Sequence, residues 1–296
     1  MRTGIFYILN MANLKEIRNR ISSVSSTMQI TSAMKMVSAA KLKKAQDAIT
    51  AMRPYSDKLT ELLQSLSSTL EGDSASAFAE QREVKKVLLV VITSNRGLAG
   101  AFNSNIIKSV IHLTNTKYAN QEVSYLAIGK KGNDAFKKSN NVIANKSDVF
   151  DDLTFDNVAE IAEMIMEKFV AGDFDKIEVV YNKFKNAATQ IVMTEQFLPI
   201  VPMEAEANAN TDYTFEPSQV EIVEQLIPKS LKTQLYKSIR DSFASEHGAR
   251  MTAMHKATDN ATDLRDELKL TYNKARQASI TNEILEIVGG AEALNN

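Results

Sequence analysis

Residues 21–46 of the chain read ISSVSSTMQITSAMKMVSAAKLKKAQ, and this stretch decides the fold. Its apolar positions belong to a series that starts at Leu14 and recurs at alternating intervals of three and four residues as far as Met28. That spacing is typical of a helix that coils around a second helix. The series then shifts by one residue to Met34 and Val37. Many outward positions are Ser, Thr or Ala, so the stretch predicts a slender helix that another surface can approach closely.

Glycine and proline, the residues that interrupt helices, are unevenly placed in the 296-residue chain, which has 10 glycines and 5 prolines. From residue 5 to residue 71 the only one is Pro54, and from residue 229 to residue 288 the only one is Gly248. Both ends of the chain can therefore form very long helices, while the middle holds most of the turn-forming residues.

The two ends are predicted to form one coiled-coil stalk. A helix over residues 218–294 would be about 115 Å long, whereas a globular domain of the whole chain would be about 40 Å across. We expect an N-terminal helix over residues 11–70 and a C-terminal helix over residues 218–296, which satisfy their apolar seams by packing antiparallel. Residues 1–10 read as an upstream extension that we expect to be disordered.

The middle of the chain has the pattern of an α/β domain. Residues 71–83, EGDSASAFAEQRE, form a linker by composition, and residues 84–93 are a continuous apolar run typical of a buried strand. Strands and helices then alternate, with a polar excursion before Pro217. The predicted fold class is an α/β lobe over residues 84–217, inserted between two long terminal α-helices, with one edge strand antiparallel.

The sequence shows no catalytic, cofactor or metal site. The loop SNRGLAGAFN, residues 94–103, lacks the GK[ST] ending of a P-loop, and the chain has no G-x-S-x-G elbow. The absence of Cys excludes a disulfide or thiolate metal site. His247 and His255 are eight residues apart, which does not fit a metal-binding pair on a helix. The net charge of −1 disfavours a nucleic-acid binder, and no apolar run is long enough for a membrane span.

Four segments together resemble the gamma subunit of the F-type ATP synthase. They are residues 21–46, residues 94–103, ASEHGARMTAMHKATDNA at 244–261, and LKLTYNKARQASITNEILEIVGGAEAL at 268–294. The resemblance implies a rotor shaft without a catalytic site of its own. Its partners would be the alpha and beta subunits of the catalytic ring, the epsilon subunit and the c-ring. It would lie peripherally at the cytoplasmic face of a bacterial inner membrane, and its complex would couple ATP synthesis or hydrolysis to proton transport.

The same resemblance implies specific contact residues. Contacts with the catalytic ring would come from one residue of the first helix and five of the last: Met34, Arg250, Gln277, Thr281, Glu283 and Glu286. A foot on the c-ring and epsilon subunit would come from an aromatic and acidic cluster: Tyr213, Phe215 and Glu216. A solvated helix end is the alternative for the acidic pair.

Two other functions compete with the rotor. A non-catalytic coiled-coil tether or scaffold would have a similar stalk, but it predicts charged outer positions in place of the small ones. A helical nucleic-acid binder would use the nine basic residues of segment 11–70. That segment has no aromatic residues for base stacking in its basic part. Copurification with an alpha/beta pair that hydrolyses ATP would distinguish the rotor from both.

Overall fold

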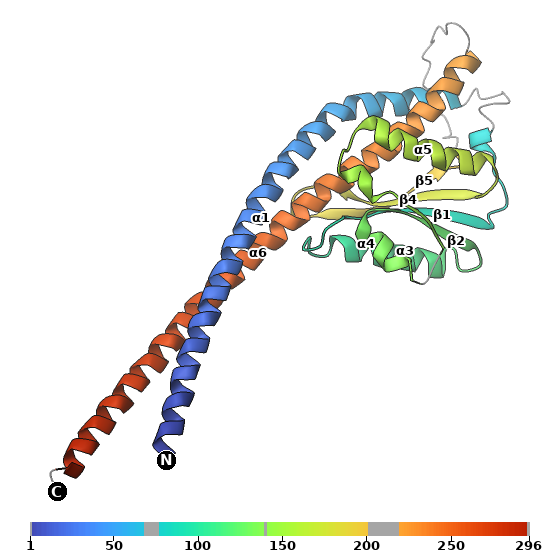
Figure 1. The fold of residues 1–296 in the computed structure, drawn as a ribbon. Helices are drawn as coiled ribbons and strands as arrows, with labels where there is room; N and C mark the ends of the chain where they lie inside the picture. Colours follow the sequence, from blue (N-terminus) through green and yellow to red (C-terminus); the bar gives the residue numbers. More distant parts are fainter. Residues whose placement is uncertain (1, 68–76, 139–140, 201–218, 295–296) are drawn as a thin grey trace. The chain divides into compact units, whose positions relative to one another are not determined.

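The structure is a computed structural model of the whole chain (Figure 1). It describes residues 2–67, 77–138, 141–200 and 219–294, and within them the side chains of 2–13, 53, 57, 60–67, 219–224 and 294 are not described. The chain divides into a stalk unit, residues 1–37 with 253–296, and a lobe unit, residues 38–252. Each unit is described below by itself.

Two long terminal helices supply segments to both units. Helix α1 spans Arg2–Ser67 and contains Pro54, and helix α6 spans Gln219–Leu294 and contains Pro228. The predicted fold class is confirmed, because an α/β lobe lies between these helices in the sequence. The extension expected to be disordered is different in the structure, where α1 already begins at Arg2. Nothing between Gly4 and Pro54 interrupts a helix, so the segment can continue backward from Met11.

The helix segments of the stalk unit run antiparallel. The hydroxyls of Thr31 and Thr258 are 2.8 Å apart, and Arg18 Nη2 donates to the Tyr272 hydroxyl at 2.6 Å. The residue number falls along α1 as it rises along α6, which is the signature of antiparallel pairing. The Arg18 guanidinium also lies over the Tyr272 ring, 5.6 Å from its centroid. Polar side chains therefore make part of the contact between the two helix segments of the stalk unit.

The seam prediction is wrong at Val37, which is 57% exposed, while the adjacent Ser38 is 3% exposed. In the lobe unit the buried positions of α1 continue as Leu42, Ala45 and Ile49, which cluster with Ala244 of α6. A shift of one residue turns a helical side chain by about 100°. The prediction chose Val37 because it is apolar, but the buried position is occupied by the small side chain of Ser38.

The lobe contains one five-stranded sheet in the order β3-β2-β1-β4-β5. The first four strands are parallel, and the edge strand β5 is antiparallel to β4, as the sequence predicts. The strand bounds are β1 Lys86–Ile92, β2 Glu122–Ile128, β3 Val142–Asn145, β4 Lys176–Phe184 and β5 Gln190–Leu198. Strand β3 was not anticipated, because its four residues are only partly buried and show no clear period.

Helices cover both faces of the sheet. Figure 1 shows α5 on one face and α3 and α4 on the other. Beneath α5 a core of strand side chains also takes in Ile227, Leu231, Leu235 and Ile239 of α6. The bounds are α3 Phe102–Thr116, α4 Lys130–Phe136, α5 Phe155–Val170 and a short 3₁₀ helix, η1, at Ser147–Phe150. The lobe unit therefore includes part of α6 as one of its packing elements.

Gly129, between β2 and α4, allows the backbone that follows β2 to lie close to Thr93 at the end of β1. Its φ is +118°, and a Cβ there would lie 2.1 Å from the Thr93 carbonyl oxygen. Only glycine fits this position. The resulting closeness lets the Gly132 amide donate to the Thr93 hydroxyl oxygen at 2.8 Å.

Candidate contact surfaces

The C-terminal part of α6 is uncovered in the stalk unit. Every residue from 281 to 293 is exposed. Large apolar side chains are among them, and Ile284 is 55% exposed while Ile287 is 66% exposed. Both continue the apolar helical spacing of the C-terminal segment, yet both are largely uncovered. Exposed apolar surface of this extent marks a site that another molecule covers.

Two of the predicted ring contacts lie on the apolar side of this segment. Gln277, Thr281, Ile284 and Val288 are spaced by four, three and four residues, so they share one face of the helix. All four are exposed. Gln277 and Thr281 can therefore supply hydrogen bonds beside the apolar side chains of Ile284 and Val288.

The predicted acidic contacts lie on the other side. Glu283 is two residues from Thr281, which places it about 200° around the helix, and Glu286 is three residues further along the same side. Both carboxylates are exposed. Between Thr281 and Val288, α6 thus presents an apolar face and an acidic face, rather than one uniform contact surface.

Met34, the predicted ring contact on α1, is half-buried. The residue two positions later, Met36, is 66% exposed, and Ile30 is 60% exposed. Lys35 Nζ lies 3.4 Å from His255 Nδ1 of α6. This part of α1 therefore has one side against α6 and an outer side with exposed apolar groups.

Arg250 is placed differently from the other predicted contacts, because it is only 7% exposed. Its Nη1 donates to Glu246 Oε1 at 2.6 Å. Its Nη2 donates to the carbonyl oxygens of Arg96 at 3.1 Å and Gly97 at 3.3 Å, in the loop between β1 and α3. The structure thus gives Arg250 a role inside the lobe unit, and its contact with the ring stays a prediction.

Two ionisable neighbours of Arg250 have shifted pKa values. Burial raises the pKa of Glu246, and the Arg250 charge offsets part of that shift. Burial, followed by the positive charges of Arg250 and Lys41, lowers the pKa of His247 to about 3. His247 is therefore a neutral imidazole at physiological pH, with its ring edge-on to Phe243.

The predicted foot residues Tyr213, Phe215 and Glu216 lie outside the described residues. The foot therefore stays a prediction from the sequence.

Leu98 lies in the loop that Arg250 holds, and neither its residue type nor the resemblance indicated a contact role for it. Its φ is +62°, in the left-handed region, and its side chain is 65% exposed. The flanking Gly97 and Gly100 were visible in the sequence as turn residues. They did not indicate that the strained position is Leu98 itself.

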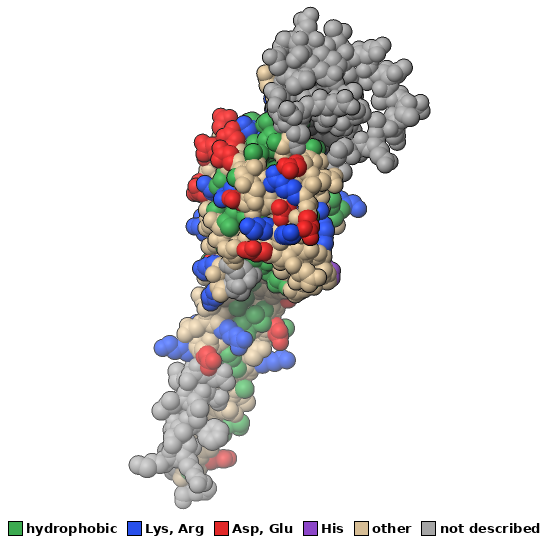
Figure 2. All heavy atoms as spheres, turned by 90° about the vertical axis from the view of Figure 1, so that its right-hand side faces the viewer, with side chains coloured by type: hydrophobic (Ala, Val, Ile, Leu, Met, Phe, Trp, Pro, Cys, Tyr) green, Lys and Arg blue, Asp and Glu red, His purple; other side chains and the backbone are tan. Residues whose placement is uncertain are grey.

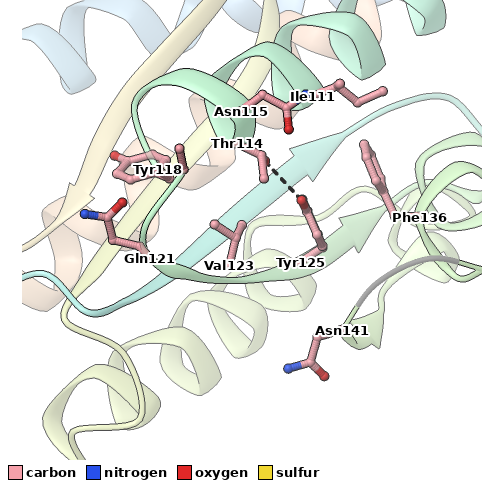
Figure 3. A pocket seen from close by; sticks show the side chains of 10 residues that line it. Ile111, Thr114, Asn115, Tyr118, Gln121, Val123, Tyr125, Phe136 and Asn141 are labelled. Carbon is pink, nitrogen blue, oxygen red and sulfur yellow. Dashed lines mark hydrogen bonds between the residues drawn. The ribbon is translucent and has the colours of Figure 1, made fainter.

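The lobe has a cavity of about 550 Å³ between α3, β2 and α4 (Figure 3). Thr114 and Tyr125 meet in it through hydroxyls 3.0 Å apart, and the Tyr125 ring stacks on Phe136 at 4.7 Å. No Asp, Glu, His, Lys or Arg lines this cavity. It therefore lacks the carboxylate, imidazole and amine groups that most often serve in acid and base catalysis.

No group of three or more His, Asp or Glu side chains could hold a metal ion among the residues described. Figure 2 shows acidic and basic side chains interspersed over the lobe face. None of the helices described has an apolar stretch sufficient to cross a bilayer.

Known proteins resemble the chain over nearly its whole length. The family described as ATP synthase matches residues 13–294. The ATP synthase gamma chain of Flavobacterium psychrophilum is 74% identical over 285 residues, which cover 96% of this chain and 99% of that protein. The chain belongs to the ATP synthase gamma chain family. The gamma chain of Cytophaga hutchinsonii is 54% identical over 295 residues, covering 97% of this chain and 100% of the relative.

Solved structures of ATP synthase share the fold. A chain of the Euglena gracilis mitochondrial enzyme aligns with a TM-score of 0.68 at 22% identity, covering 96% of this chain and 95% of that chain. A chain of the Tetrahymena thermophila mitochondrial central stalk and c-ring has a TM-score of 0.57 at 25% identity, covering 77% and 99%.

The chain is therefore a gamma subunit, the central-stalk rotor of ATP synthase. Catalysis belongs to other subunits of the complex, and the tether alternative is overturned.

Proposed function

We propose that the chain transmits rotation of a membrane c-ring to a catalytic ring of alpha and beta subunits, so that proton transport drives changes of nucleotide affinity there. The observation that supports this is the uncovered end of α6, with exposed residues throughout 281–293. A soluble helix end would not normally expose so many large apolar groups without a partner.

The two faces of that helix end give rotation a physical means of acting. A rotor changes the state of a catalytic subunit only by contacting its open and closed forms differently. Shifting a site from 1:99 to 99:1 takes about 5.5 kcal/mol of differential interaction. Burial of one large apolar side chain contributes about 1.5 to 3 kcal/mol. Several contacts must therefore act together, and an apolar face opposite an acidic face presents different chemistry as the helix turns.

In this proposal the ring contacts are Met34, Gln277, Thr281, Glu283 and Glu286, together with Arg250. The foot formed by Tyr213, Phe215 and Glu216 attaches the chain to the c-ring and the epsilon subunit. The complex lies at the cytoplasmic face of the bacterial inner membrane, with the chain peripheral to it. The segments that serve these roles are the helices over 11–70 and 218–296, the linker over 71–83 and the lobe over 84–217.

Charge reversal of the acidic face tests the proposal. Glu283→Lys combined with Glu286→Lys replaces two exposed carboxylates and should not impair folding, because neither side chain is buried. We expect assembly to persist while ATP-driven proton pumping falls several-fold relative to ATP hydrolysis. Asp156→Lys, an equally exposed reversal at the start of α5, is the control. Normal pumping in the double variant would contradict a contact role for the acidic face.

A further inference from the structure

The loop between β1 and α3 is fixed on both sides of an outward-pointing leucine. On one side, Arg250 donates to the carbonyls of Arg96 and Gly97, with Nε as a further donor to Gly97 at 3.4 Å. On the other side, Ala99 is buried with Phe102 against Ala249 of α6. The loop is thus attached twice to neighbouring residues of α6, and Leu98 lies between the two attachments.

The stability of the chain does not explain why a leucine occupies position 98. A non-glycine residue with φ of +62° is strained, and glycine would adopt that conformation without cost. The Leu98 side chain is 65% exposed, so little of the strain is offset by burial. A strained and exposed apolar side chain held on a fixed loop is explained by a contact outside the chain.

The guanidinium of Arg250 is committed to this loop. Its bonds to Glu246, Arg96 and Gly97 occupy its three nitrogens, and its Nη1 lies 3.4 Å from His247 Nδ1. The low pKa of His247 keeps that imidazole neutral, so it adds no positive charge beside the guanidinium. Because Arg250 is 7% exposed, little of it is available to a partner.

We propose that Arg250 is a positioning residue, which holds the loop at residues 96–98 in the shape that presents Leu98 to the catalytic ring. The proposal rests on the rotor function proposed above. It replaces a direct contact between Arg250 and the ring with an indirect one, made through two backbone carbonyls. A planar fork is suited to this task, because its nitrogens can reach two carbonyls and a carboxylate together.

Proteolysis of the full chain tests the positioning role without the ring. Trypsin cleaves after Arg96, which is exposed on the loop, and after Lys185, which is exposed in the hairpin between β4 and β5. Arg250→Lys keeps the charge and loses the fork. We expect it to raise the rate of cleavage after Arg96, relative to that after Lys185, about tenfold, because local opening sets that rate.

A second arginine on α6 is the matched control. Arg240 Nη2 donates to the Leu153 carbonyl at 2.8 Å, so it also holds a backbone segment. Arg240→Lys should leave the cleavage ratio at Arg96 unchanged. Equal ratios in wild type and Arg250→Lys would overturn the positioning role.

Coupled turnover of the assembled complex tests the contact through the loop. Leu98→Gly relieves backbone strain and removes an exposed side chain, so it should fold. We expect Leu98→Gly and Arg250→Lys each to lower proton pumping per ATP hydrolysed several-fold. The double variant should pump no less than whichever single variant pumps less, because both changes remove the same contact. Additive losses would show that Arg250 acts separately from the loop, and unchanged pumping in Leu98→Gly would remove the loop contact. Either result overturns the proposal. The rotor function is tested separately by the charge reversal at Glu283 and Glu286, so the two failures can be distinguished.

Discussion

Helix α6 carries two segments of opposite character. From Ile227 to Arg250 most side chains are buried, including the charged pair of Glu246 and Arg250. From residue 281 to residue 293 every side chain is exposed, including isoleucines as large as those in the core. The secondary structure is the same in both segments, so what differs is whether this chain covers the helix. The first segment is part of the lobe core, whereas the second is exposed, and we propose that it is a surface for other subunits.

The largest difference between the segments is expected for matched isoleucine truncations. Ile239 is fully buried, so Ile239→Ala should lower the free energy of unfolding by about 2 to 5 kcal/mol. Ile284 is 55% exposed, so Ile284→Ala should change it by no more than about 0.5 kcal/mol. Urea unfolding of the purified chain measures both. Equal losses would mean that the end of α6 is covered within the chain.

The buried segment should also give a pH dependence through His247. Its folded pKa of about 3 lies below the unfolded value, so the unfolded chain binds the proton more readily. Stability is then complete above about pH 6.5 and falls toward pH 3 by at most about 1.4 kcal/mol per pH unit. The raised pKa of Glu246 acts in the opposite direction, because protonation favours the folded form.

Replacing the imidazole isolates its contribution. Between pH 7 and pH 5 the wild-type chain should lose about 2 kcal/mol more unfolding free energy than His247→Gln. The Glu246 contribution is common to both chains and largely cancels. Denaturant unfolding at a series of pH values measures the difference, and parallel curves would contradict a neutral buried imidazole.

The smallest expected difference in unfolding free energy between the two segments concerns a glycine in each. At Gly248 an added Cβ would lie 3.1 Å from Ala187 Cα, so Gly248→Ala should be destabilising by about 1 kcal/mol after its gain in helix propensity. At Gly289 nothing lies within 4 Å, so Gly289→Ala should stabilise by about 0.5 to 1 kcal/mol. Thermal unfolding of the two variants compares them, and a gain at both sites would show that the hairpin yields easily at Ala187.

The sequence predicts the long helices, the lobe and most of its strands, because these follow from local features. The scarcity of glycine and proline near both ends predicts α1 and α6, and continuous apolar runs predict the buried strands. The seam fails at Val37 because burial depends on which face meets a partner helix, and residue type alone does not determine that face. Strand β3 is too short and too exposed to carry a period.

The candidate contacts were less predictable for a different reason. The resemblance placed Arg250 among the ring contacts, but its carbonyl partners lie 153 and 154 residues earlier in the chain. No local pattern shows that pairing. The spacing of Ile284 and Ile287 identifies an apolar face of the helix and leaves open which molecule covers it.

Cysteine labelling can detect whether another subunit covers the end of α6, since the chain has no natural Cys to interfere. Ile284→Cys should react rapidly with a water-soluble maleimide in the free chain, because Ile284 is exposed there. In the assembled ATP synthase complex we expect labelling at least about tenfold slower, because another subunit covers the helix end. Asp156→Cys on α5 provides a labelled reference in both samples. Equal labelling of Ile284→Cys in the free chain and the complex would show that no subunit covers the end of α6, and the proposed contact surface would be wrong.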